Sequence, residues 1–128
     1  MKSKTSVMLT LLAGAIAGGA AVQALHAQAK PPAYVVVENE ISNREAYLKD
    51  YVPAAFKAIT ANGGKFIARG GNTVAIEGEP PKSRALVVVF DTLEKAQAAF
   101  ATDAYKEARA VGDKYAKFRI WAVEGVQP

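Results

Sequence analysis

Apolar residues in this chain form two kinds of pattern, short continuous runs and stripes with helical spacing. Runs rich in valine and aromatic residues, typical of β-strands, occupy residues 34–38, 65–69, 85–90 and 118–124. Between the first two runs, and again between the last two, apolar residues recur every three or four positions, as on one face of a helix. The pattern therefore predicts the order strand, helix, strand, strand, helix, strand.

This order of elements is typical of one α+β architecture. In a ferredoxin-like βαββαβ domain, two right-handed crossovers build a four-stranded antiparallel sheet with both helices on one face. We therefore predict that fold for residues 34–125. Residues 30–33, which include two prolines, form a short lead-in, and residues 126–128 form a tail.

The first predicted helix begins with a capping box. Glu45 follows Ser42 by three residues, a spacing that lets the glutamate reach back to the Ser42 amide. Pro53 lies inside the helix, and because it lacks an amide hydrogen and crowds the preceding turn, we expect a kink or break near Asp50. The apolar stripe of this helix is formed by Leu48, Val52, Ala55, Phe56 and Ile59.

Glycines and capping residues mark the other boundaries. Asn62-Gly63-Gly64 ends the first helix, because glycine adopts the left-handed cap conformation at little cost. Gly70-Gly71-Asn72 bends or bulges the second strand, which we expect to continue as extended chain over 73–77. The two halves of the second helix begin at Asp91 or Thr92 and near Thr102.

The predicted strands are apolar on both faces. Residues 86–90 are five large apolar residues in succession, and 35–37 are three valines. Two helices cover only one face of a four-stranded sheet, and large exposed apolar patches are rare on soluble monomers. Burying a few hundred Å² more at ~25 cal/mol per Å² is worth several kcal/mol. We therefore expect a homodimer packed sheet to sheet; the alternative is that β propensity alone favours valine and one face stays open.

The first 29 residues have the pattern of a bacterial export signal. Lys2 and Lys4 form a basic start, residues 7–22 are mostly apolar, and Ala27-Gln28-Ala29 has small residues at the two positions that signal peptidase reads. This apolar run is shorter than the ~20 residues that a spanning helix needs. We therefore expect cleavage after Ala29 and a periplasmic or secreted protein; the alternative is an uncleaved N-terminal membrane anchor.

Composition limits what the mature chain does. Removing residues 1–29 leaves 99 residues, enough for one domain with a modest core. Its formal charge is +2, from 14 basic and 12 acidic residues that are interspersed, which forms no basic patch for nucleic acid. We expect no nucleic-acid partner, and membrane contact only through an uncleaved signal segment.

Side chains for metal and thiol chemistry are missing. The chain has no cysteine, and its single histidine, His26, lies in the signal segment. The mature chain therefore lacks thiol nucleophiles, the commonest general base and the best ligands for zinc, copper or haem iron. It also has no Asp-rich calcium loop and no glycine-rich phosphate loop of the required spacing. We predict no metal site and no cofactor, and a Ser-His-Asp triad is excluded.

Several short motifs, in order along the chain, resemble those of one family. They are Gly64-Lys65-Phe66-Ile67-Ala68-Arg69-Gly70-Gly71, Glu77-Gly78-Glu79, the strand 84–90, Thr102-Asp103-Ala104-Tyr105 and Val123-Glu124-Gly125. Over residues 34–125 the chain resembles the bacterial family known as domain of unknown function 1330. That family is similar to the dimeric α+β barrels, ferredoxin-like units that dimerise through their sheets. The resemblance implies this fold and a homodimer, and it implies no settled activity.

One motif departs from the family pattern. Where family members often read Ser-Pro-Glu-Tyr, this chain reads Thr-Asp-Ala-Tyr over residues 102–105. The tyrosine is kept as Tyr105, whereas the acidic residue moves to Asp103. A role for a glutamate directly before this tyrosine is therefore not carried over to this chain.

In this fold a cavity lies between the sheet and the helices or at the dimer seam, and polar or aromatic residues that face it are candidates for ligand contacts. Arg69 with Gly70 combines a cation with backbone amides, which suits a carboxylate or enolate oxygen. The alternative is a β-bulge with an ordinary surface arginine. Hydroxyl groups for a ligand, or for completing the core, belong to Tyr34, Tyr47, Tyr51 and Tyr105.

Glu38 is a weak candidate for a catalytic base. It follows three valines in the first predicted strand, and a carboxyl group that is buried there would have a raised pKa. The alternative is a carboxylate at a strand end in water. Trp121 is most simply explained by packing in the core or at the dimer seam.

Three functions are compatible with these residues. The first is an exported homodimer that binds a small hydrophobic or aromatic molecule without a cofactor. The second is a cofactor-free enzyme, an isomerase or monooxygenase-like protein, acting on an activated aromatic or enolic substrate with Glu38 or a tyrosine as base. The third is a structural or stress-associated dimer with a packed interior. An enclosed cavity lined by Arg69, Tyr105 and an acid would favour the first two.

Overall fold

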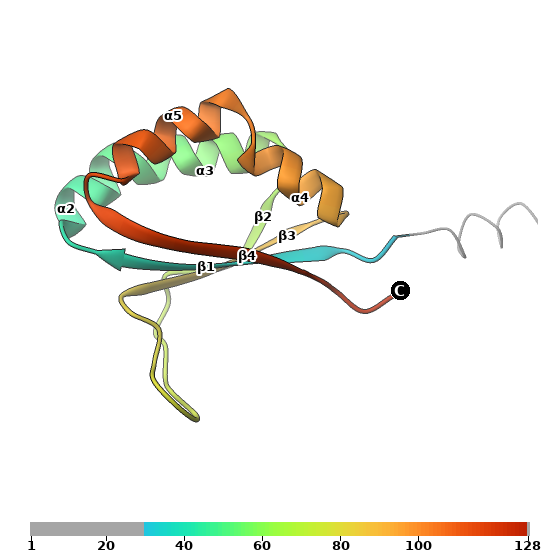
Figure 1. Cartoon of the computed structure of the whole chain (residues 1–128), viewed down its shortest axis with the longest axis horizontal. Helices are drawn as coiled ribbons and strands as arrows, with labels where there is room; N and C mark the ends of the chain where they lie inside the picture. Colours follow the sequence, from blue (N-terminus) through green and yellow to red (C-terminus); the bar gives the residue numbers. More distant parts are fainter. Residues whose placement is uncertain (1–29, 128) are drawn as a thin grey trace, which may run out of the picture. The chain divides into compact units, whose positions relative to one another are not determined.

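A four-stranded antiparallel sheet carries the helices on one of its faces (Figure 1). The computed structural model describes residues 30–127, so the predicted signal segment, residues 1–29, lies outside the described residues. The spatial order of the strands, β2-β3-β1-β4, confirms the predicted ferredoxin-like βαββαβ fold. The strands are β1 (Ala33–Ile41), β2 (Lys65–Arg69), β3 (Arg84–Phe90) and β4 (Ala116–Glu124).

Each crossover contains more than one helical segment. The first comprises α2 (Arg44–Ala46), the π-helical segment η1 (Tyr47–Tyr51) and α3 (Val52–Ala61), and the second comprises α4 (Leu93–Phe100) and α5 (Asp103–Gly112). The expected restart of the second helix is confirmed, because the Thr102 hydroxyl caps α5 by accepting a hydrogen bond from the Tyr105 amide at 3.2 Å. Among residues 30–127, every helix is too short or too polar to span a bilayer.

The first helix begins differently from the prediction. Asn43 is the N-cap, and its side-chain oxygen accepts a hydrogen bond from the Ala46 amide at 3.2 Å. The Ser42 hydroxyl instead donates to the Tyr115 carbonyl at 3.0 Å, just before β4 begins. The predicted capping box at Ser42 is therefore wrong, because a contact between distant parts of the chain uses that hydroxyl.

The helix widens just before Pro53 and does not break there. The Val52 amide donates to the Tyr47 carbonyl, five residues back, which is the π-helical pattern. Pro53 then falls in the first turn of α3, where its missing amide hydrogen is not needed. The wider turn changes the buried stripe: Tyr47 and Tyr51 are buried, whereas Leu48, expected in the stripe, is 38% exposed.

The connection between β2 and β3 is less regular than predicted. Residues 70–83 form a largely exposed loop with no strand, and the bulge lies between Phe66 and Ala68. The expected bend at Gly70 is confirmed, since β2 ends at Arg69 and Gly70 has a φ of +69°. Residues 73–77 pair with no strand of the sheet. The loop projects from the sheet on the side away from the helices, and it carries the exposed residues Val74 and Ile76 (Figure 1).

Alternation along the strands separates two faces of the sheet. The face under the helices is buried, with Val35 and Val88 among its most buried residues. The other face, called the open face below, is also apolar, and Val36 at its centre lies opposite Val87 on β3 and Trp121 on β4. The apolar part of the open face is formed by Tyr34, Val36, Val87, Val89, Trp121 and Val123, and the paired Glu38 and Arg119 lie on the same face.

Candidate functional site

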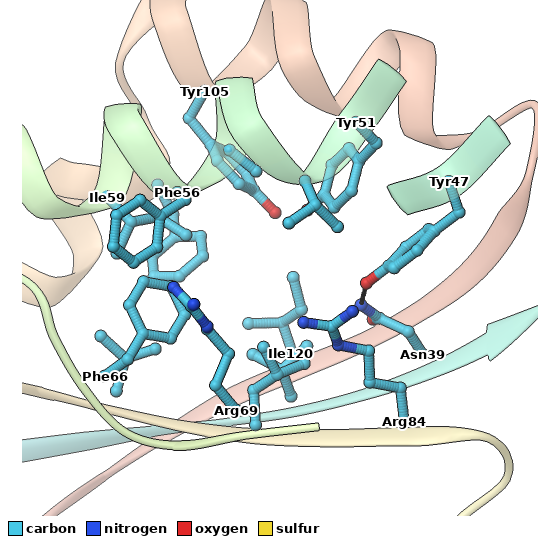
Figure 2. Close-up of a pocket in the computed structure, with 16 residues that line it drawn as sticks. Asn39, Tyr47, Tyr51, Phe56, Ile59, Phe66, Arg69, Arg84, Tyr105 and Ile120 are labelled. Carbon is cyan, nitrogen blue, oxygen red and sulfur yellow. Dashed lines mark hydrogen bonds between the residues drawn. The ribbon is translucent and has the colours of Figure 1, made fainter. Parts of the chain in front are cut away.

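A small cavity lies between the sheet and the helices (Figure 2). Its volume is about 40 Å³, which leaves room for roughly three water molecules. Arginine side chains rise into it from the strands, and tyrosine side chains point into it from the helices (Figure 2). Ten of its sixteen lining residues are apolar, and the polar ones are Asn39, Tyr47, Tyr51, Arg69, Arg84 and Tyr105.

Three buried polar atoms in the described part of the chain have no hydrogen-bond partner. They are Asn39 Oδ1, Arg84 Nε and Tyr105 OH, and all three residues line this cavity. Buried polar atoms in folded proteins are nearly always paired, and each one left unpaired costs roughly 1–3 kcal/mol. Because all three residues line the cavity, a polar guest that enters as the cavity widens would satisfy these atoms.

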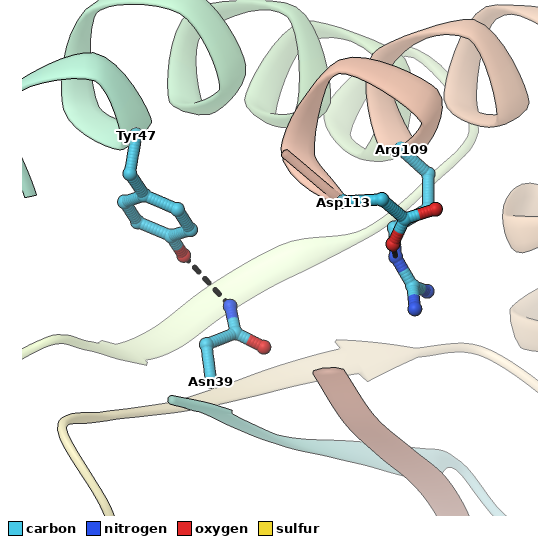
Figure 3. Close-up of polar contacts among 4 residues, drawn as sticks. All are labelled: Asn39, Tyr47, Arg109 and Asp113. Carbon is cyan, nitrogen blue, oxygen red and sulfur yellow. Dashed lines mark hydrogen bonds and ion pairs between the residues drawn. The ribbon is translucent and has the colours of Figure 1, made fainter. Parts of the chain in front are cut away.

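Asn39 is the central polar residue of the sheet side of the cavity. It is 1% exposed, because it follows Val35 and Val37 on the helix-facing side of β1. Its amide nitrogen donates to the Tyr47 hydroxyl at 2.7 Å (Figure 3). Since the Tyr47 oxygen accepts this bond, its own O–H can donate to another group.

A second polar pair, on α5, has a different position. Arg109 Nε donates to Asp113 Oδ1 at 3.0 Å (Figure 3), and the Arg109 guanidinium also lies 3.9 Å from the centre of the Phe118 ring. Neither residue of this pair lines the cavity. The Arg109–Asp113 pair therefore belongs to the surface of α5 and not to the candidate site.

Two arginines bring positive charge to the cavity. The Arg69 guanidinium carbon lies 4.5 Å from the centre of the Phe56 ring and 5.8 Å from that of Phe66. The corresponding Arg84 carbon lies 5.6 Å from the centre of the Tyr47 ring. No carboxylate among residues 30–127 forms an ion pair with either arginine, and none lines the cavity. Both cations therefore face aromatic rings in place of counter-ions.

Burial keeps two phenols of the cavity, Tyr47 and Tyr51, protonated. It raises the pKa of Tyr47, against the opposing effects of the Asn39 hydrogen bond and the Arg84 charge. Burial also raises the pKa of Tyr51, and the neighbouring Tyr105 phenol adds to that shift. A phenol with a raised pKa donates hydrogen bonds at neutral pH and is a poor general base.

These shifts predict a loss of stability above about pH 10. In the unfolded chain, tyrosines ionise near their ordinary pKa of 10.0, whereas folded Tyr47 and Tyr51 keep their protons. The unfolded state then binds fewer protons, so the free energy of unfolding falls as pH rises, by up to about 1.4 kcal/mol per pH unit and group. Urea unfolding on both sides of this pH measures the fall.

Tyr51→Phe tests the cause of this pH dependence. It should weaken the alkaline loss of stability, since it removes one buried phenol with a raised pKa. A midpoint that stays constant between about pH 9 and pH 11 in the wild type would contradict the assigned shifts.

Four of the residues proposed from the sequence, one arginine and three tyrosines, meet at this cavity. Arg69, Tyr47 and Tyr105 all line it, and so does Tyr51. Gly70 does not offer its amide as expected, because β-sheet pairing uses that group: the Gly70 N–H donates to the Ala85 carbonyl at 3.0 Å. No acid joins them, so the cavity lacks one of the three groups that the sequence analysis looked for.

Tyr34 and Glu38 lie elsewhere. Both point to the open face, because even-numbered residues of β1 alternate with the buried odd-numbered ones. The Glu38 carboxylate pairs with Arg119 of β4 at 3.4 Å. These two candidates are therefore on the opposite side of the sheet from the cavity. In the described residues, no three His, Cys, Asp or Glu side chains gather in a way that could hold a metal ion.

Asn39 and Arg84 are cavity residues that the sequence pattern did not predict. The prediction ended the first strand at Glu38 and began the third at Ala85, one residue short of each. In the structure Asn39 and Arg84 are direct partners in the β1–β3 register. The alternation that buries Val35, Val37 and Leu86 would have found both, had the predicted strands been extended by one residue.

Comparison with known proteins identifies the family. The model of the family described as domain of unknown function (DUF1330) matches residues 32–126. This chain is a member of the DUF1330 family. No functionally curated protein matches the DUF1330 chain in sequence.

Solved structures similar to this DUF1330 protein share its fold. A protein of unknown function from Rhodopseudomonas palustris is 15% identical with a TM-score of 0.61, covering 84% of this chain and 93% of that one. SnoaB, a cofactor-independent oxygenase from Streptomyces nogalater, is 10% identical with a TM-score of 0.56, covering 77% and 96%. An ethd family protein from Bacillus halodurans is 18% identical with a TM-score of 0.51, covering 75% and 99%. At these identities the likeness establishes the fold alone.

Proposed function

We propose that this DUF1330 protein binds a small molecule, with a hydrophobic or aromatic body, in the cavity between its sheet and helices. The observation that carries the proposal is the convergence of three unpartnered buried polar atoms, of Asn39, Arg84 and Tyr105, on one cavity with apolar walls. In a purely structural interior each of these atoms only lowers stability. Apolar walls with a few convergent polar groups are typical of small-molecule sites.

The entrance to the cavity lies between β2 and α3. Small-molecule pockets usually measure about 300–1,000 Å³, so a cavity of about 40 Å³ must widen when an organic ligand enters. Arg69 and Phe56 line the cavity and are also exposed. Swinging the Arg69 guanidinium outward breaks no ion pair and gives up two cation–π contacts, each worth about 0.5–1 kcal/mol.

The chemistry of the cavity favours binding over base-dependent catalysis. A general base must lie within hydrogen-bond reach of the proton it removes. No carboxylate lines the cavity, and Glu38 lies on the other face of the sheet. Tyr47 and Tyr51 have raised pKa values and stay protonated. The cofactor-free enzyme therefore has less support than the binding protein.

Native mass spectrometry of the protein purified from its own host tests the proposal. We expect a retained small molecule in the wild type. Ala55, which lines the cavity, and Ala54, which is exposed on the same helix, offer a matched pair. Ala55→Val narrows the cavity and should lose the retained mass, whereas Ala54→Val carries the same helix-propensity cost and should keep it.

Two outcomes would contradict the binding function. One is a wild-type protein that carries no extra mass and gains no thermal stability from a panel of small aromatic compounds. The other is a retained molecule that Ala55→Val keeps as fully as Ala54→Val does, since that molecule would then lie outside the cavity.

The second part of the proposal is a homodimer packed through the open faces. The open face is apolar, and Trp121 and Val123 on it are 44% and 53% exposed. The loop 70–83 projects on the same side of the sheet, with Val74 and Ile76 exposed (Figure 1). Covering a few hundred Å² of this surface with a second copy would contribute several kcal/mol at ~25 cal/mol per Å².

The third part of the proposal is export to the periplasm or beyond. It is supported by the basic start, the apolar run and the Ala27-Gln28-Ala29 pattern in the first 29 residues. The intact mass of the exported protein tests it. A chain that begins at Lys30 is expected, and an intact Met1 in the membrane fraction would point to the anchored alternative.

A further inference from the structure

We propose that the ligand of this cavity presents an anionic oxygen, a carboxylate or an enolate, to Arg84, with the hydroxyls of Tyr47 and Tyr105 as further donors. The inference rests on the proposed binding function and names the class of ligand that the site takes. Three observations support it: the unpartnered hydrogen-bonding groups of the cavity, the positive charge of the cavity, and the packing that positions the Arg84 side chain.

The open hydrogen-bonding groups are mostly donors. Arg84 Nε–H is buried without a partner, and the Tyr105 hydroxyl is likewise unpartnered. The Tyr47 oxygen accepts from Asn39 at 2.7 Å, so its O–H is free to donate. Against these donors stands one open acceptor, Asn39 Oδ1. A complementary ligand therefore supplies chiefly acceptor oxygens, with room for one hydroxyl beside them.

The charge of the cavity has one sign. Arg69 and Arg84 both line it, and neither forms an ion pair with a carboxylate among the described residues. A cation in apolar surroundings is costly unless it is paired, and the cost grows as water is displaced. A neutral aromatic guest would displace water and leave Arg84 unpaired. An anionic guest pairs with it, and a guanidinium fork binds two oxygens of a carboxylate at once.

The Arg84 side chain is held in place before any ligand arrives. Arg84 pairs with Asn39 in the β1–β3 register, which puts the arginine beside the cavity's open acceptor. Its guanidinium also lies against Gly70: a Cβ atom on Gly70 would be 3.0 Å from Arg84 Nε and 3.2 Å from Cζ. Gly70 therefore leaves the space that the Arg84 head occupies, and a positioned cation loses little entropy on binding.

Benzoate and benzamide are suitable probes, because they have nearly the same shape and differ in charge. We expect isothermal titration to give benzoate at least a ten-fold lower Kd than benzamide for the wild-type mature chain. Arg84→Gln should remove this preference, and Arg84→Lys, which keeps the charge without the fork, should reduce it. Arg44→Gln removes one charge from an exposed site on α2 and should leave the preference unchanged.

The ratio of the Kd values for benzoate and benzamide shows whether Arg84 binds the ligand or only stabilises the fold. If Arg84 only packs on the Tyr47 ring, Arg84→Gln and Arg84→Lys would lower the melting temperature without changing that ratio, and the inference would be overturned. Equal affinity for the two probes would also overturn it while leaving the binding function intact. Failure of the protein to bind either benzoate or benzamide would also overturn the inference. A molecule retained in native mass spectrometry then shows that the binding function survives.

Discussion

Replacing Val123 with lysine should convert the proposed sheet-to-sheet dimer into a monomer, whereas replacing Val126 with lysine should not. Val123 lies on the open face and is 53% exposed, and Val126 follows the end of β4 and is 89% exposed. In a two-fold sheet-to-sheet dimer, one substitution places two ammonium groups in the apolar interface. Each unpaired buried charge costs several kcal/mol. We therefore expect the dimer Kd to rise by at least about a thousand-fold, since 1.4 kcal/mol corresponds to a factor of ten.

Light scattering over a range of protein concentrations measures this effect. The two variants carry the same added charge on the same chain, so their difference reports where the charge lies. If both became monomers, net repulsion would explain the result and the open face would have no special part. A wild type that is monomeric at micromolar concentration, or a Val123→Lys variant that stays dimeric, would contradict the sheet-to-sheet interface.

The fold was predictable because strand and helix patterns alternate clearly along this chain. The bounds of β2 agree with the prediction, and the others extend it by one to three residues at an end. β1 continues to Ile41 because Ser83, from the loop 70–83, holds its end: the Ile41 amide donates to the Ser83 hydroxyl at 2.7 Å, and that hydroxyl donates to the Asn39 carbonyl at 2.9 Å. A partner 44 residues away is invisible to a local pattern.

The π-helical turn could not be predicted from spacing alone. A regular helix with a period of 3.6 residues puts Leu48 in the buried stripe, whereas the structure buries Tyr47 and Tyr51. What decides between them is tertiary packing. The Tyr51 ring lies 5.1 Å from the Phe118 ring, centre to centre, and against Gly112, where a Cβ atom would be 2.5 Å from Tyr51 Cδ1. The packing that favours the π-helical turn therefore comes from the backbone of α5 at Gly112 and from the Phe118 ring of β4.

Only part of the candidate site was predicted, again because contacts between distant parts of the chain decide the rest. Residue type alone singled out Arg69 and the three tyrosines of the cavity, Tyr47, Tyr51 and Tyr105, because cations and phenols are suited to ligands. Asn39 and Arg84 become neighbours only through the register between β1 and β3, and no sequence pattern states that register. Whether a polar residue joins the candidate site thus depends on which residue it pairs with on the neighbouring strand. The fold depends only on the order of strands and helices along the chain.

Gly64→Ala should lower the free energy of unfolding by about 3 kcal/mol, the upper part of the range for overpacking. Gly64 is buried between α3 and β2, and a Cβ atom there would lie 2.5 Å from Ile59 Cγ2 and 2.8 Å from Phe90 Cζ. It would also lie 2.9 Å from the Ile59 carbonyl oxygen, which accepts the Gly64 amide at 3.0 Å. The Ile59 carbonyl group cannot move away from the added Cβ atom as a side chain could, so the turn between α3 and β2 must open.

Two other glycines, Gly63 and Gly71, serve as controls that separate steric contact of the added Cβ atom from strain in the backbone conformation. Gly63 has a φ of +91° and nothing within 4 Å of a Cβ atom, so Gly63→Ala should cost only the left-handed strain of about 1–2 kcal/mol. Gly71 has neither constraint, and Gly71→Ala should stay within about 0.5 kcal/mol. For a domain of this size, the Gly64 variant should melt at least about 12 °C lower, at 4–8 °C per kcal/mol. If Gly63→Ala proved as damaging as Gly64→Ala, backbone strain would explain the series and close packing at the α3–β2 turn would not.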